Sequence, residues 1–114
     1  MPERIVKRVQ ASPEGLFIYI PSETRNRYEV DVGDAIRCTL IRLISRRGDR
    51  VEVNRSLILE VRGYWNELHL PQEALNGLNV EAGDYVELVL EEVIRGGGRV
   101  RIYGGRFVEG ERDL

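Results

Sequence analysis

Apolar and polar side chains alternate along most of this 114-residue chain, as expected for β-strands that bury one face. The alternation and the intervening Gly and Pro turns predict strands over residues 4–10, 16–20, 35–45, 50–54, 56–61, 67–70, 85–94 and 99–103. Two sets of alternating positions are predicted to face a core: Ile36, Cys38 and Leu40, and Val86, Leu88 and Leu90. Each set lies in one of the two longest strands.

The chain is an internal duplication with a period of 50 residues. Residues 18–34 read IYIPSETRNRYEVDVGD, and residues 68–84 read LHLPQEALNGLNVEAGD. Six of the seventeen aligned positions are identical without a gap, at Pro21/Pro71, Glu23/Glu73, Asn26/Asn76, Val30/Val80, Gly33/Gly83 and Asp34/Asp84. A repeat of this length indicates two structural units. We call residues 4–54 copy one and residues 56–104 copy two.

The shared residues predict how each unit is built. An apolar strand ends at Pro, whose fixed φ suits the first turn of a helix, and Glu two residues later favours that turn. The helix is short, and Gly77 ends it in copy two. Gly and Asp then form a tight turn before the next strand. Each unit is therefore expected to be strand, short helix, turn and strand.

Many short strands with two small helices predict a mostly β fold that closes into a barrel. The duplication predicts a pseudo-two-fold barrel to which each copy contributes half of the strands. The length suits a single domain, since a copy of about 50 residues would be marginal alone. We expect one barrel domain over residues 1–108 and a flexible tail over residues 109–114.

Charge is distributed unevenly between the halves, although the net charge is only −2. Residues 1–57 hold 11 basic and 8 acidic residues, net +3, and residues 58–114 hold 6 and 11, net −5. This balance argues against an even nucleic-acid-binding surface and leaves room for a one-sided basic face. The single cysteine, and the lack of a signal-like or membrane-length apolar run, predict a cytoplasmic protein without membrane association.

Residues for catalysis or metal binding are not evident in the sequence. His69 is the single histidine and has no Cys or His neighbour, so no metal site or cofactor is predicted. Residues 96–98 are Gly-Gly-Gly, but they lack the lysine and the strand-to-helix setting of a phosphate loop. We therefore expect a protein that is not an enzyme.

The strings IYIPSETRNRY, VDVGD and LHLPQEALNGLNVEAGD resemble the AbrB/SpoVT/MazE family, in which a strand ends in Ile-Pro, a short helix follows and a Gly-Asp turn leads into a strand. The resemblance covers nearly the whole chain, twice. It implies a swapped-hairpin barrel made as a pseudo-dimer by one chain. The related double-psi barrel is the alternative fold.

The resemblance also implies DNA binding and transcription regulation. Matching positions assign double-stranded DNA contacts to Lys7, Arg8, Arg25 and Arg27 of copy one. Copy two departs from the family pattern, with Leu75 and Asn76 where copy one has Arg25 and Asn26, and with Glu60 in its first strand. The alternative is a protein-interaction barrel that has lost DNA binding.

Two further surfaces are candidates for partners. Ile41, Leu43 and Ile44 make one strand of copy one apolar on both faces, which suggests self-association. Tyr64 and Trp65 fall at a predicted hairpin tip, where they either cover an end of the barrel or contact a protein partner.

Overall fold

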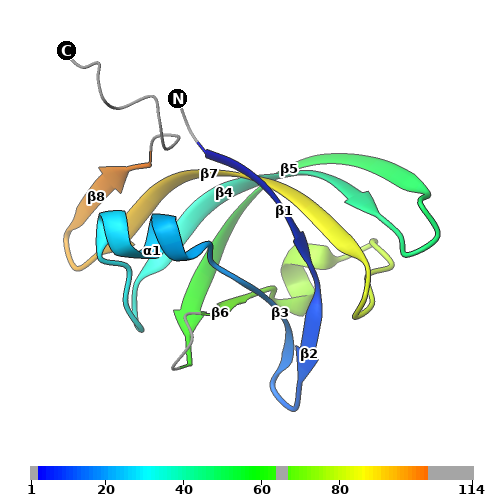
Figure 1. Cartoon of the computed structure of the whole chain (residues 1–114), viewed down its shortest axis with the longest axis horizontal. Helices are drawn as coiled ribbons and strands as arrows, with labels where there is room; N and C mark the ends of the chain where they lie inside the picture. The colour runs from blue at the N-terminus through cyan, green and yellow to red at the C-terminus, as the bar shows by residue number, and fades with distance from the viewer. Residues whose placement is uncertain (1–2, 64–66, 103–114) are drawn as a thin grey trace.

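The computed structural model of the chain describes residues 3–63 and 67–102. Most of them belong to one curled antiparallel sheet (Figure 1). In chain order the elements are β1 (Glu3–Arg8), β2 (Gln10–Ser12), β3 (Gly15–Tyr19), α1 (Ser22–Tyr28), β4 (Ala35–Ile44), β5 (Arg50–Arg62), β6 (Glu67–His69), the 3-10 helix η1 (Gln72–Leu75), β7 (Tyr85–Arg95) and β8 (Gly98–Arg101).

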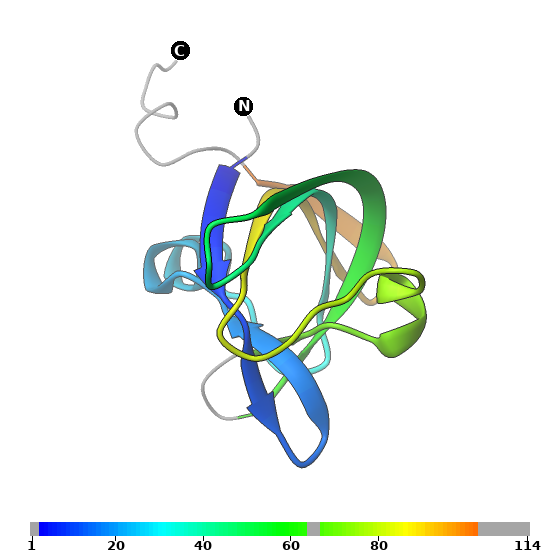
Figure 2. The ribbon, with the colours of Figure 1, turned by 90° about the vertical axis from the view of Figure 1, so that its right-hand side faces the viewer.

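The strand pairing returns to its starting point. The order across the sheet is β1, β7, β4, β5, β6, β3 and β2, and β8 pairs with β7. Only Val9 separates β1 from β2, so one nearly continuous strand both begins and ends the path. The end-on view shows the resulting ring of strands (Figure 2). The predicted mostly β, barrel-like class is confirmed.

The pairing register has the two-fold symmetry that the duplication predicts. Thr39 of β4 pairs with Val89 of β7, and Ile18 of β3 pairs with Leu68 of β6. Both pairs join residues 50 apart (89 − 39 and 68 − 18). A residue lies opposite its own counterpart only at a two-fold axis. A pseudo-two-fold axis therefore passes through both pairs.

The first strands follow the same symmetry with an offset of 52 residues. Ile5 pairs with Leu88, and Leu57 pairs with Cys38, so Ile5 corresponds to Leu57 (57 − 5). Because the offset is 50 again at Ile18, copy one has two extra residues between its first strand and that position. They lie in the β2–β3 hairpin.

The two Gly-Asp turns hold the first strand of the opposite copy. Val9 donates its N–H to the carbonyl of Asp84 at 2.8 Å and accepts from Gly83 at 2.9 Å. Val61 makes the matching bonds with Asp34 at 2.9 Å and Gly33 at 3.2 Å. The Asp34 and Asp84 carboxylates accept the N–H three residues before them, as expected for this turn.

Inward-facing side chains of both copies form one hydrophobic core, and both predicted inward-facing sets are fully buried. Cys38 lies among them as a free thiol. Burial raises the pKa of the Cys38 thiol to about 12, and the nearby Glu91 carboxylate acts in the same direction.

Three local features differ from the sequence expectation. The helix of copy two is only the single 3-10 turn η1, because Asn76 leaves the helical conformation and Gly77 follows with φ +81°. Residues 50–62 form one strand, with Asn54 at φ 53°, where two strands were expected. A bulge between Leu40 and Arg42 shifts the alternation of β4, and this shift turns Leu43 into the core.

Among the described residues, no helix has the length and apolar character needed to cross a membrane.

The Gly-Asp turn gives a first prediction. Gly33 has φ +98° and open space around it, so Gly33→Ala should lower the free energy of unfolding by about 1–2 kcal/mol through backbone strain alone. Gly97→Ala is the control, because Gly97 is equally uncrowded and has no positive φ. Equal denaturant midpoints for the two variants would contradict this account of the turn.

Cys38 gives a second prediction. Its thiol should react slowly with a thiol reagent in the native protein and rapidly in denaturant, because burial keeps it protonated and inaccessible. Cys38→Ser should destabilise the fold by about 1–3 kcal/mol, since a buried hydroxyl would lack a partner. Rapid labelling without denaturant would contradict the burial of Cys38 in the core.

Candidate nucleic-acid interface

The predicted DNA-contacting residues come from two elements of copy one, β1 and α1. Thr24 of α1 donates a hydrogen bond to the Glu3 carboxylate of β1, and Thr24 is buried. Helix α1 begins directly after Pro21, carries Glu23 in its first turn, and ends at Tyr28, after which Glu29 adopts a left-handed conformation. The contact with Glu3 sets α1 beside the start of β1 (Figure 1).

Arg8, Arg25 and Arg27 are exposed, whereas Lys7 is half-buried. Lys7 lies on the face of β1 that also carries the buried residues Ile5 and Val9, because side chains alternate along a strand. Lys7 and Arg8 therefore point to opposite sides of β1. The three arginines are better placed than Lys7 to reach a ligand.

Most other arginines of copy one form ion pairs within the molecule. Arg4, Arg37, Arg42 and Arg46 each form an ion pair with a glutamate of copy two. A hydrogen bond to Glu92 raises the pKa of Arg37, and one to Glu52 raises the pKa of Arg42. The bond from Arg37 lowers the pKa of Glu92. Arg37 and Glu92 therefore hold each other in the charged state.

In contrast, Lys7, Arg8 and Arg25 form no ion pair with any of the residues that the structure describes. No described acidic side chain therefore neutralises these three charges. Copy two does not reproduce them: the counterpart of Arg25 is the buried Leu75, and the counterpart of Lys7 is the buried Leu59. Copy two therefore lacks a basic residue at both of these positions.

Arg95 is a basic residue near α1 that the sequence did not single out. Its Nη2 donates to the carbonyl of Tyr28 at 2.7 Å and lies 3.2 Å from the Asp34 carboxylate. It therefore stabilises the last turn of α1 and the Gly-Asp turn behind it. Sequence pattern gave no signal for this role, since Arg95 is 67 residues from Tyr28 and precedes a glycine turn.

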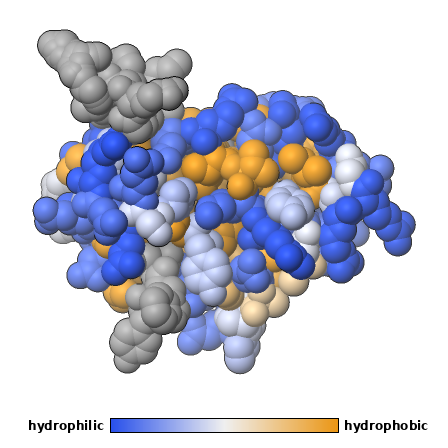
Figure 3. Space-filling view, viewed as in Figure 1, coloured by the Kyte–Doolittle hydropathy of each residue, from blue (hydrophilic) through white to orange (hydrophobic). Residues whose placement is uncertain are grey.

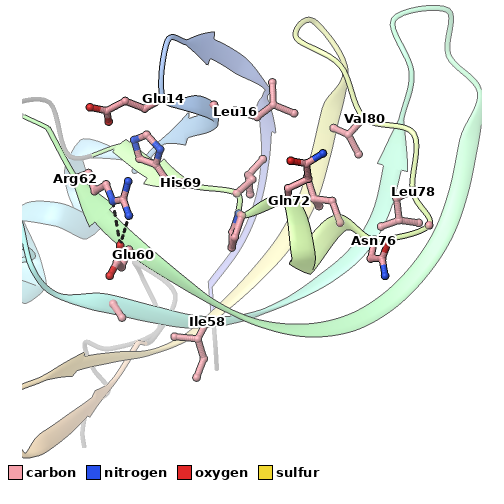
Figure 4. A pocket seen from close by; sticks show the side chains of 16 residues that line it. Glu14, Leu16, Ile58, Glu60, Arg62, His69, Gln72, Asn76, Leu78 and Val80 are labelled. Carbon is pink, nitrogen blue, oxygen red and sulfur yellow. Dashed lines mark hydrogen bonds and ion pairs between the residues drawn. The ribbon is translucent and has the colours of Figure 1, made fainter.

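A second candidate site is a groove of about 930 Å³ on the side of copy two (Figure 4). The tip of the β2–β3 hairpin, the side chains of β5, and η1 with the following loop form its walls. Ile58 is 59% exposed there, and Arg62 binds Glu60 at 2.7 Å. His69 is buried, stacks on Phe17 and lies 3.1 Å from a Glu67 oxygen. The groove mixes apolar surface with charged groups of both signs.

The predicted self-association surface is only partly accessible. Leu43 is buried, so only the half-buried Ile41 and Ile44 remain for the predicted self-association surface. Tyr64 and Trp65 lie outside the described residues, as does the predicted tail. Within residues 3–63 and 67–102, no three His, Cys, Asp or Glu side chains are grouped to hold a metal ion.

Comparison with known proteins supports the fold. No protein-family model matches the chain, and no curated protein matches it. It is similar to the solution structure of PHS018 from Pyrococcus horikoshii, with a TM-score of 0.56 and 18% sequence identity. The similarity covers 83% of this chain and 95% of PHS018. At this identity the similarity concerns the fold alone.

Proposed function

We propose that this chain is a cytoplasmic, non-enzymatic DNA-binding regulator of the AbrB-like type, and that copy one contacts double-stranded DNA. The observation that carries the proposal is the division of the basic residues. Arginines at the junction of the copies are paired with glutamates, while Arg8 and Arg25 are exposed and have no ion pair within the described chain. Arginines that lie unpaired on the neighbouring elements β1 and α1 are available together to phosphates and base edges.

The placement of β1 and α1 supports this function. Arg25 and Arg27 lie on one short helix that the Thr24–Glu3 bond fixes against β1, which carries Arg8. Hydrophilic side chains gather over α1 on the face shown in Figure 3, and apolar side chains are exposed along the upper part of the sheet. DNA would therefore meet the α1 side, with Lys7 a weaker contributor because its side chain is half-buried.

We also propose that the barrel is of the swapped-hairpin type, with the double-psi barrel as the alternative. Each copy supplies a first strand that pairs with a long strand of the other copy, β1 with β7 and β5 with β4. This crossing supports an intertwined barrel in which neither copy is complete alone.

The DNA proposal predicts a salt-dependent affinity. Three exposed arginines should give a log–log slope of about −3 for binding to mixed genomic DNA, since each neutralised phosphate contributes roughly −0.9. Arg25→Ala should reduce this slope by about one unit and weaken binding to all sequences. Fluorescence anisotropy at several salt concentrations measures both quantities.

Arg47→Ala is the matched control for Arg25→Ala. Arg47 is also exposed but sits at the tip of the β4–β5 hairpin, away from α1 (Figure 1). It should leave affinity and slope unchanged. Absent DNA binding at low salt, or equal effects of the two substitutions, would reject the DNA-binding function and favour the interaction barrel.

The groove favours a second candidate function, binding of an extended peptide from a partner protein. Between Ser56 and Glu60, β5 pairs only with β4 among the described strands, so its other edge can accept a further strand. Arg55 donates to the carbonyls of Ala74 and Asn76, which holds η1 alongside this edge. The carboxylates of Glu14 and Glu60 favour a peptide that carries basic as well as apolar side chains.

Ile58→Cys, labelled with a photo-crosslinker, tests the groove. Val6→Cys is the control, because Val6 is its counterpart in copy one (58 − 6 = 52), is 52% exposed and does not line the groove. Native Cys38 is buried and should not be labelled. Crosslinking in cell extract should yield a basic, extended segment from the Ile58 position alone. The same products from both positions would exclude a specific groove.

A further inference from the structure

The two copies carry opposite charges at equivalent positions of the strands that join them. Arg37 and Arg42 of β4 correspond, 50 residues on, to Glu87 and Glu92 of β7. The β4–β7 register pairs Arg37 with Glu92 and Arg42 with Glu87. These two pairs are related by the pseudo-two-fold axis at Thr39 and Val89. The axis therefore relates each of these arginines to a glutamate at the equivalent position of the other copy.

Both pairs are close, and they are shielded from water to different degrees. Arg42 Nη1 lies 2.7 Å from Glu87 Oε1, and Arg37 Nε lies 3.1 Å from Glu92 Oε1. Glu87 is only 6% exposed, and Arg4 of β1 also binds it at 2.8 Å. Charges in such a setting interact more strongly than charges in open solvent, so their signs affect stability.

The symmetry shows what a barrel of two identical copies would contain. Two copies of copy one, joined in the same register, would place Arg37 opposite Arg42 twice. Two copies of copy two would place Glu87 opposite Glu92 twice. Like charges directly opposite each other on a sheet are destabilising, and more so where one of them is buried.

We propose that the β4–β7 junction is a recognition surface whose partner is the opposite copy, so that copy one accepts copy two and rejects a second copy of itself. Because of these charges, a stable barrel contains one copy one and one copy two. The chain completes its own barrel, and any exchange between chains still joins copy one to copy two. Each barrel then presents the unpaired basic residues of copy one once, not on two symmetric sides.

Two double variants of the full chain recreate the like-charged junctions. Arg37→Glu with Arg42→Glu produces an all-acidic junction, and Glu87→Arg with Glu92→Arg produces an all-basic one. Each should lower the thermal unfolding midpoint by about 5 °C or more at low salt, and the loss should shrink at high salt. The quadruple variant restores opposite charges in inverted order. It should recover at least about half of the loss, with Arg4, Glu52, Glu91 and Arg99 as remaining like-charged neighbours.

Arg47→Glu with Arg50→Glu is the charge-matched control, because both arginines are exposed at the β4–β5 hairpin and form no ion pair with the described residues. It should shift the midpoint much less than the acidic double variant. The proposal is overturned if the junction variants have the same thermal unfolding midpoint as the control. It is also overturned if the midpoint of the quadruple variant is no higher than that of either double variant.

Discussion

The barrel depends on two residues, Val9 and Val61, at which the first strand of each copy changes its pairing partner. Before Val9 the chain pairs with β7, and after it with β3; at Val61 the partner changes from β4 to β6. At both points the Gly-Asp turn of the opposite copy bonds the N–H and the carbonyl. A buried N–H or carbonyl without a hydrogen bond would destabilise the fold. The turns supply these bonds at the point where neither neighbouring strand does. Both valines are almost fully buried.

This arrangement makes the copies interdependent while leaving their surfaces free to differ. The core positions match between copies, as Ile36 does with Val86 and Leu40 with Leu90. Outside the core, Arg25 of α1 corresponds to Leu75 of η1, and Glu3, which binds Thr24, corresponds to Arg55, which binds the end of η1. In each copy the first strand therefore holds the short helix of the same copy, but through different side chains. Copy one retains exposed basic groups, and copy two borders a groove.

Charged residues have two roles in this protein, and the two groups of residues differ in how far they are buried. At the β4–β7 junction, Arg42 and Glu87 are fixed by neighbouring strands and shielded from solvent, so they influence which strands pair. On α1 and at Arg8 the charges are exposed, where pairs contribute little to stability. Arg8 and Arg25 in particular form no ion pair with the described residues and can contact a ligand. The net charge of −2 conceals this division.

The sequence by itself determined the duplication, the Pro and Gly-Asp boundaries and the alternating core, because each rests on local backbone preference or on period-two burial. It did not determine the continuity of β5, the inward turn of Leu43 or the half-burial of Lys7. A single bulge reverses the face of every later residue in a strand, and local composition does not locate it. The ion pairs from Arg42 to Glu87 and from Arg95 to Asp34 join residues 45 and 61 positions apart. Only the tertiary structure, which sets the register between the copies, decided which basic residues are neutralised and which stay exposed.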